Sequence, residues 1–91
     1  MKLDNEHNIL ENFSRLKWAC RRGMLELDVL LGNFLEEAYP DLSLADKQRF
    51  IALLGQSDQD LYKWLLGREQ PADKELVNIT EAIRRHARSR I

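Results

Sequence analysis

The sequence predicts an all-α protein, a compact five-helix bundle that forms a single domain. Apolar residues recur at helical spacing in every long segment, and no stretch alternates apolar and polar residues as a half-buried strand would. Glycine or proline falls between the periodic segments, which indicates short connections and helices packed against their neighbours. At 91 residues, one domain is the default, and we expect a single helical domain over residues 1–91.

The first helix is predicted from about Asn8 to Arg22. Its apolar stripe at helical spacing consists of Ile9, Phe13, Leu16 and Cys20. Asn8 and Glu11 fit a capping box at its start. Arg21 and Arg22 stand where cations favour a helix C-terminus, and Gly23 stands where a C′ glycine would be.

The second helix is predicted to follow almost at once, from about Met24 to Ala38, and Pro40 stops it. Its core stripe consists of Leu27, Leu30, Leu31, Phe34 and Leu35. Glu26 falls in the first turn, where a carboxylate is favourable. Because a left-handed backbone costs glycine little, we interpret Gly23 as the hinge of a tight helix–helix corner.

The rest of the chain predicts three further helices, over about residues 44–54, 57–66 and 72–88. Ser43 with Asp46 forms a capping-box pattern at the first of these. Ser57 with Asp60 forms the same pattern at the second. Pro71 stands in a helix-starting position before the third.

The charge pattern argues against nucleic acid as a partner. The chain has 14 basic and 15 acidic residues, so no global basic field is present. Four arginines near the C-terminus could touch phosphates: Arg84, Arg85, Arg88 and Arg90. We favour a solvated helix end whose cations suit the helix dipole. The corner at Gly23 resembles a helix-turn-helix, but Glu26, Asp28, Glu36 and Glu37 in its second helix would repel phosphate.

No catalytic or metal-binding pattern is present. His7 and His86 are isolated, and Cys20 has no cysteine neighbour at ligand spacing, so we expect no metal site. Cys20 lies on the apolar stripe, which favours a core residue over a nucleophile. The single cysteine excludes an intramolecular disulfide, and no apolar run approaches a membrane span. We expect a cytoplasmic monomer without direct membrane insertion.

The residues around Gly23 allow two interpretations. Trp18 lies opposite the apolar stripe, so it either packs beneath another helix or serves as a contact residue, with Arg22 one turn further on. Arg22 and Glu26 flank the glycine, with Asp28 close by. They form either a charged corner that caps two helix ends or a surface knob with fixed polar groups. The residues alone leave both interpretations open.

The segment "WACRRGMLELDVLLGNFL" resembles the signature of the succinate dehydrogenase assembly and flavinylation factors, the SdhE/YgfY family. The signature here is Arg22-Gly23-x-x-Glu26, extended by Arg21 and by Leu27-Asp28. Downstream, "FIALLGQSDQDLYKWLLG" also fits the family pattern. The resemblance covers a core of about residues 8–70, followed by a variable C-terminal helix at about 72–88.

The resemblance implies a five-helix fold and an assembly factor, or chaperone, that binds the flavoprotein subunit of succinate dehydrogenase and promotes covalent attachment of FAD to it. It also implies service to fumarate reductase. The covalent chemistry would belong to the client, so we expect no enzyme activity and no stably bound cofactor. Arg22, Gly23 and Glu26 would contact the client, flanked by Arg21 and Asp28. The alternative function is the antitoxin of a toxin–antitoxin pair.

Overall fold

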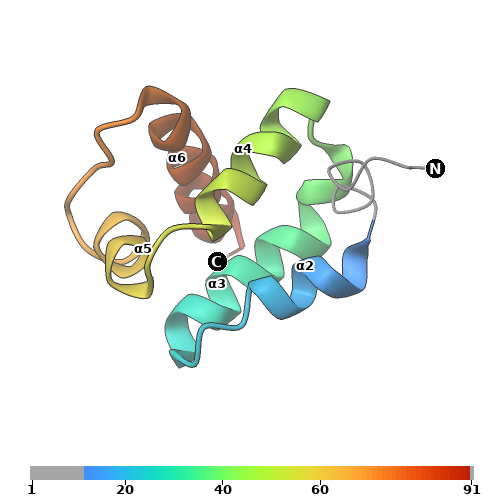
Figure 1. Cartoon of the computed structure of the whole chain (residues 1–91), viewed down its shortest axis with the longest axis horizontal. Coiled ribbons are helices and arrows are strands. Elements are labelled where there is room, and N and C mark those ends of the chain that lie inside the picture. Colours follow the sequence, from blue (N-terminus) through green and yellow to red (C-terminus); the bar gives the residue numbers. More distant parts are fainter. Residues whose placement is uncertain (1–11, 91) are drawn as a thin grey trace.

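In the computed structural model, residues 12–90 are described, and they contain α-helices and no β-strand (Figure 1). The elements are α2 (Phe13–Ala19), α3 (Leu25–Glu37), a short 3-10 helix η1 (Tyr39–Asp41), α4 (Leu44–Leu54), α5 (Asp58–Leu65) and α6 (Lys74–Ser89). The predicted all-α class is therefore confirmed. None of these helices is both long and apolar enough to cross a membrane.

The last helix, α6, holds the arrangement together, because it packs against α3, α4 and α5. α2 packs against α3, and the two lie side by side along one edge of the molecule (Figure 1). α5 lies at one end, and a loop carries the chain from it to α6 (Figure 1). The turn from α2 into α3 is thus left at the surface.

The core lies where these helices meet. Its fully buried side chains are Leu27, Leu31, Phe34, Leu35, Phe50, Leu53, Leu61, Ile79 and Ile83. The four that lie on α3 belong to the apolar stripe predicted for the second helix. Each of the nine stabilises the fold by about 1.5–3 kcal/mol on burial. Phe34 and Phe50 pack in a tilted arrangement with ring centroids 5.4 Å apart, which joins α3 to α4. Phe13, predicted for the first stripe, is partly exposed instead.

Two of the predicted helix caps are confirmed. The Ser43 hydroxyl accepts the Asp46 N–H at 3.1 Å, and the Ser57 hydroxyl accepts the Asp60 N–H at 3.1 Å. These bonds satisfy amides that would otherwise have no partner in the first turn. The cap predicted at Asn8 lies outside the described residues.

The first helix differs from the prediction at both ends. α2 begins at Phe13, where the Asn12 side chain accepts the Arg15 N–H. It ends at Ala19 rather than at Arg22, so the prediction that Gly23 is a C′ glycine is wrong. The physical reason lies in the corner, where the backbone N–H of Arg22 is bound by a side chain of α3 and not by the preceding turn.

The last helix begins later than expected. α6 starts at Lys74, and its cap is Asp73, whose carboxylate accepts the Glu75 N–H at 2.9 Å. Pro71 precedes that cap and is buried, so it belongs to the loop and not to the first turn.

Candidate functional site

The corner between α2 and α3 depends on the backbone conformation of Gly23. Its φ of 84° is in the left-handed region, and among residues 12–90 no other residue has a positive φ. The predicted left-handed hinge is therefore confirmed. A Cβ atom at this position would meet nothing within 4 Å. The fold of this chain therefore requires glycine here for its backbone conformation, and not because a neighbouring atom leaves no room for a Cβ atom.

Asp28 fixes the corner from the first turn of α3. Its Oδ1 accepts the backbone N–H of Arg22 at 2.6 Å, and its Oδ2 accepts the N–H of Gly23 at 3.2 Å. One carboxylate therefore binds the two amides that precede the second helix, in the manner of a helix cap. Asp28, predicted to flank a contact surface, has this internal role.

The Arg22 guanidinium lies inside the molecule, with its side chain only 15% exposed. Nη1 donates to the carbonyls of Ala19 and Leu54, each at 2.9 Å. Nη2 donates to the Gln56 carbonyl at 2.7 Å, and Nε pairs with the Asp58 carboxylate at 2.7 Å. Arg22 thereby joins the C-terminal ends of α2 and α4 to the first turn of α5. The interpretation of a charged corner that caps helix ends holds for this residue.

The opposite side of the corner is exposed. Glu26 is at the surface, and its carboxylate has no hydrogen bond or ion pair with any residue in the described part of the chain. Trp18 is 72% exposed, so the interpretation that it packs beneath another helix is wrong. The Arg21 guanidinium stacks over the Trp18 ring at 5.4 Å. Leu25 and Val29 are exposed as well. We call Trp18, Arg21, Leu25, Glu26 and Val29 the corner face.

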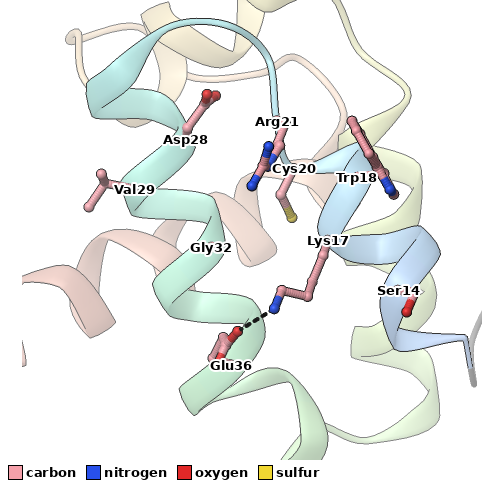
Figure 2. Close-up of a pocket in the computed structure, with 9 residues that line it drawn as sticks. All are labelled: Ser14, Lys17, Trp18, Cys20, Arg21, Asp28, Val29, Gly32 and Glu36. Atoms are coloured by element: carbon pink, nitrogen blue, oxygen red, sulfur yellow. Dashed lines mark ion pairs between the residues drawn. The ribbon is translucent and has the colours of Figure 1, made fainter.

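A groove of about 530 Å³ lies between α2 and α3, and the Trp18 and Arg21 side chains lie next to each other at its rim (Figure 2). Lys17 reaches across it to Glu36 at 3.2 Å. Cys20 lies at its base, where its side chain points between the helices (Figure 2). Burial raises the pKa of the Cys20 thiol to about 12. The thiol is therefore protonated at neutral pH, as expected of a core residue and not of a nucleophile.

A second groove, of about 370 Å³, lies on the other side of α3, and we call it the α3–α6 groove. It is lined by Leu25, Glu26, Val29, Leu30, Asn33, Leu66, His86, Ala87 and Arg90. Residues from the ends of α5 and α6 complete it, far from the corner in sequence. Sequence patterns alone missed this groove, because they do not show that these helix ends come to lie beside α3.

The arginine-rich end of the chain is partly tied into the fold. Arg84 donates to the carbonyls of Trp64 and Gly67, each at 3.1 Å. Arg90 forms a bidentate pair with Glu37, with both distances 2.8 Å. The hydrogen bond from Arg90 is the main reason why the pKa of Glu37 is below its usual range. These contacts support a structural role for the two arginines over phosphate binding.

The fold and the corner define a small helical protein that presents an exposed apolar and charged surface, as protein-binding modules do. In the part of the chain that the structure describes, no three histidine, cysteine, aspartate or glutamate side chains group as metal ligands. Residues 14–87 match the family model described as the flavinator of succinate dehydrogenase. The chain belongs to this family. The match includes α6, which lies beyond the 8–70 core of the sequence resemblance.

Three relatives, each named FAD assembly factor SdhE, illustrate the similarity. The protein from Shewanella oneidensis is 47% identical over 78 residues, which cover 86% of this chain and 95% of the relative. The one from Colwellia psychrerythraea is 48% identical over 81 residues, 88% of this chain and 89% of the relative. The one from Yersinia pseudotuberculosis is 42% identical over 81 residues, which cover 89% of this chain and 92% of the relative. Nothing in these names supports the antitoxin alternative.

Proposed function

We propose that this chain is an assembly factor that binds the flavoprotein subunit of succinate dehydrogenase in the cytoplasm and promotes covalent attachment of FAD to it. The corresponding subunit of fumarate reductase is a second client in this proposal. The family model and the names of the relatives support the activity. The observation that carries the site is the corner face, where the exposed side chains of Leu25 and Val29 line the same groove as the unpaired Glu26.

The internally bonded residues of the corner and its exposed residues would have different roles. Arg22 and Asp28 hold the backbone of the corner through internal hydrogen bonds. A surface fixed in this way binds without a large ordering cost. Trp18, Leu25 and Glu26 would then contact the client and hold its FAD domain in the geometry in which the client's own histidine reacts. This is catalysis by positioning, and the chain needs no stably bound cofactor of its own.

Covalent flavin on the client tests this function directly. We would compare in-gel flavin fluorescence of the flavoprotein subunit from cells that lack this chain, cells with the wild type and cells with Gly23→Arg. The proposal predicts that the signal is lost without the chain, returns with the wild type and stays absent with the variant. Unchanged flavin attachment in the cells that lack the chain would contradict the proposal.

Gly23→Asn shows whether the client needs a bare backbone at the corner. Asparagine tolerates a left-handed conformation better than other side chains, so this variant keeps the corner. A Cβ atom here meets nothing within 4 Å in the chain, so a side chain at this position begins in open space and a thermal melt measures any strain in the free protein. Loss of flavin with a folded Gly23→Asn variant would support close approach of the client. Normal flavin would show that glycine is needed only for its φ.

A further inference from the structure

The α3–α6 groove carries apolar surface that packing of this chain leaves uncovered. Leu25 is 79% exposed and Val29 is 51% exposed, one helical turn apart on α3. Val29 points away from α2 (Figure 2), and it lines this groove together with Leu66 from the end of α5. Contiguous exposed apolar surface of this kind marks an interaction site more often than isolated exposed leucines do.

The charges at this groove are unequal. Arg90 and His86 both line it. Arg90 forms an ion pair with Glu37 at 2.8 Å, and the His86 Nε2 lies 3.0 Å from the same carboxylate, a contact that is an ion pair only when the imidazole is protonated. Glu26 also lines it and has no partner among residues 12–90. The groove therefore combines apolar side chains with a carboxylate, that of Glu26, with which no cation among residues 12–90 pairs. A bound segment would be complementary if it brought a cation to Glu26 and apolar side chains to Leu25, Val29 and Leu66.

The groove is continuous with the corner face, because Leu25, Glu26 and Val29 belong to both. Its volume of about 370 Å³ holds a few side chains and not a folded domain. The occupant must therefore be a short protruding segment, such as a loop or one turn of a helix.

We infer that the α3–α6 groove docks a segment of the client flavoprotein in which a lysine or arginine is flanked by apolar side chains. This inference rests on the proposed function and extends its site from the corner to the ends of α5 and α6. Glu26 pairs with the cation, and Leu66 is an apolar contact that lies outside the Arg22-Gly23-x-x-Glu26 signature. The groove thus sets which segment of the client is held.

Leu66 and Leu44 provide a matched pair of variants. Leu66 lines the groove, whereas Leu44 is an exposed leucine at the start of α4 and does not line it. The dissociation constant of purified flavoprotein subunit is measured for the wild type, Leu66→Lys and Leu44→Lys, after thermal melts establish that the variants are folded. We expect Leu66→Lys to weaken binding about tenfold or more, as loss of a central apolar contact does. Leu44→Lys should stay within about twofold.

Cross-linking identifies the occupant. A photoreactive group attached at Leu66→Cys would be site-specific, because Cys20 is buried with a pKa of about 12. After irradiation with the purified subunit, we expect cross-linked client peptides that contain a lysine or arginine among apolar residues. Cross-links to acidic or purely polar client segments would overturn the inference. Cross-links to a second copy of this chain would overturn it as well.

The outcomes separate this inference from the function on which it rests. If the wild type binds the subunit and restores covalent flavin while Leu66→Lys binds equally well, the groove is not the docking site and the proposed function stands. If the wild type neither binds the subunit nor affects its flavin, the proposed function fails and the docking inference fails with it.

Discussion

Arg22 and Glu26 are four residues apart in one short motif, yet their side chains have opposite environments. The Arg22 guanidinium donates to three backbone carbonyls and to Asp58, and it is largely withdrawn from solvent. Glu26 is exposed and has no partner within the described residues. One half of the motif therefore maintains the fold, and the other half is available for binding.

The difference follows from where each residue lies relative to the helix ends. Arg22 comes before α3, where its long side chain reaches the unsatisfied carbonyls at the ends of α2 and α4. Glu26 lies in the first turn of α3, on the side that faces away from the core. A motif of adjacent charged residues can thus combine a structural role with a contact role, and substitutions should separate the two.

Replacing Arg22 should have the largest effect on stability. Arg22→Ala leaves the partly buried carbonyls of Ala19, Leu54 and Gln56 without this donor and removes the partner of Asp58. We expect a loss of about 2–4 kcal/mol in the free energy of unfolding. In a domain of this size the melting temperature should fall by about 10 °C or more. Arg22→Lys should recover only part of this loss, because an ammonium group cannot reproduce the guanidinium fork. Thermal melts that match the wild type would contradict the internal role of Arg22.

Asp28→Asn should have the next largest effect. The substitution removes the charge and replaces one of the two acceptor oxygens with an amide donor, so the N–H groups of Arg22 and Gly23 no longer each have an oxygen of their own. We expect a loss of about 1–2 kcal/mol, similar to the loss of a helix cap. Denaturant titration of both proteins measures it. An equally stable variant would show that the corner does not depend on this carboxylate.

Gly23→Ala should cost about 1–2 kcal/mol, because alanine must adopt a φ of 84°. Gly23→Asn should cost less, since asparagine enters this region more readily. The control is Gly32→Ala, within α3, where φ is not positive and a Cβ atom meets nothing within 4 Å. The same denaturant titration ranks the three variants. If Gly23→Asn were as destabilised as Gly23→Ala, the left-handed backbone would not explain the glycine.

Trp18→Ala should have the smallest effect on stability. The side chain is 72% exposed, and its stacking with Arg21 is at the surface. We expect a change within about 0.5 kcal/mol, together with weaker binding of the flavoprotein subunit. A melt and a binding titration of the same preparation check both expectations. A large loss of stability would show that Trp18, like Arg22, maintains the fold.

The helices, most of the core and two caps could be predicted from the sequence, because they depend on local spacing. The pattern that opens α4 at Ser43 is contained within four residues, and so is the pattern that opens α5 at Ser57. The left-handed hinge at Gly23 was predicted for the same reason. These features need no knowledge of which distant segments meet.

The roles at the site could be predicted only in part. The end of α2 was placed too late, because the helical pattern continues to Arg22 while Asp28 takes the Arg22 amide. The burial of the Arg22 guanidinium depends on Leu54 and Gln56, more than 30 positions away. The α3–α6 groove likewise requires Leu66 and Arg90 to lie beside α3. No local pattern in the sequence contains that information.

Glu26→Gln tests most directly the claim that the motif divides into a structural half and a binding half. The substitution keeps the size of the side chain and removes the charge that we assign to client binding. The control is Glu69→Gln, an exposed glutamate in the loop before α6. The measurement is covalent flavin on the flavoprotein subunit in cells carrying each variant, with a thermal melt of the purified protein. The account predicts that Glu26→Gln melts within a few degrees of the wild type and fails to support covalent flavin, while Glu69→Gln supports it. Normal flavin with Glu26→Gln, or a loss of stability as large as that of Arg22→Ala, would contradict it.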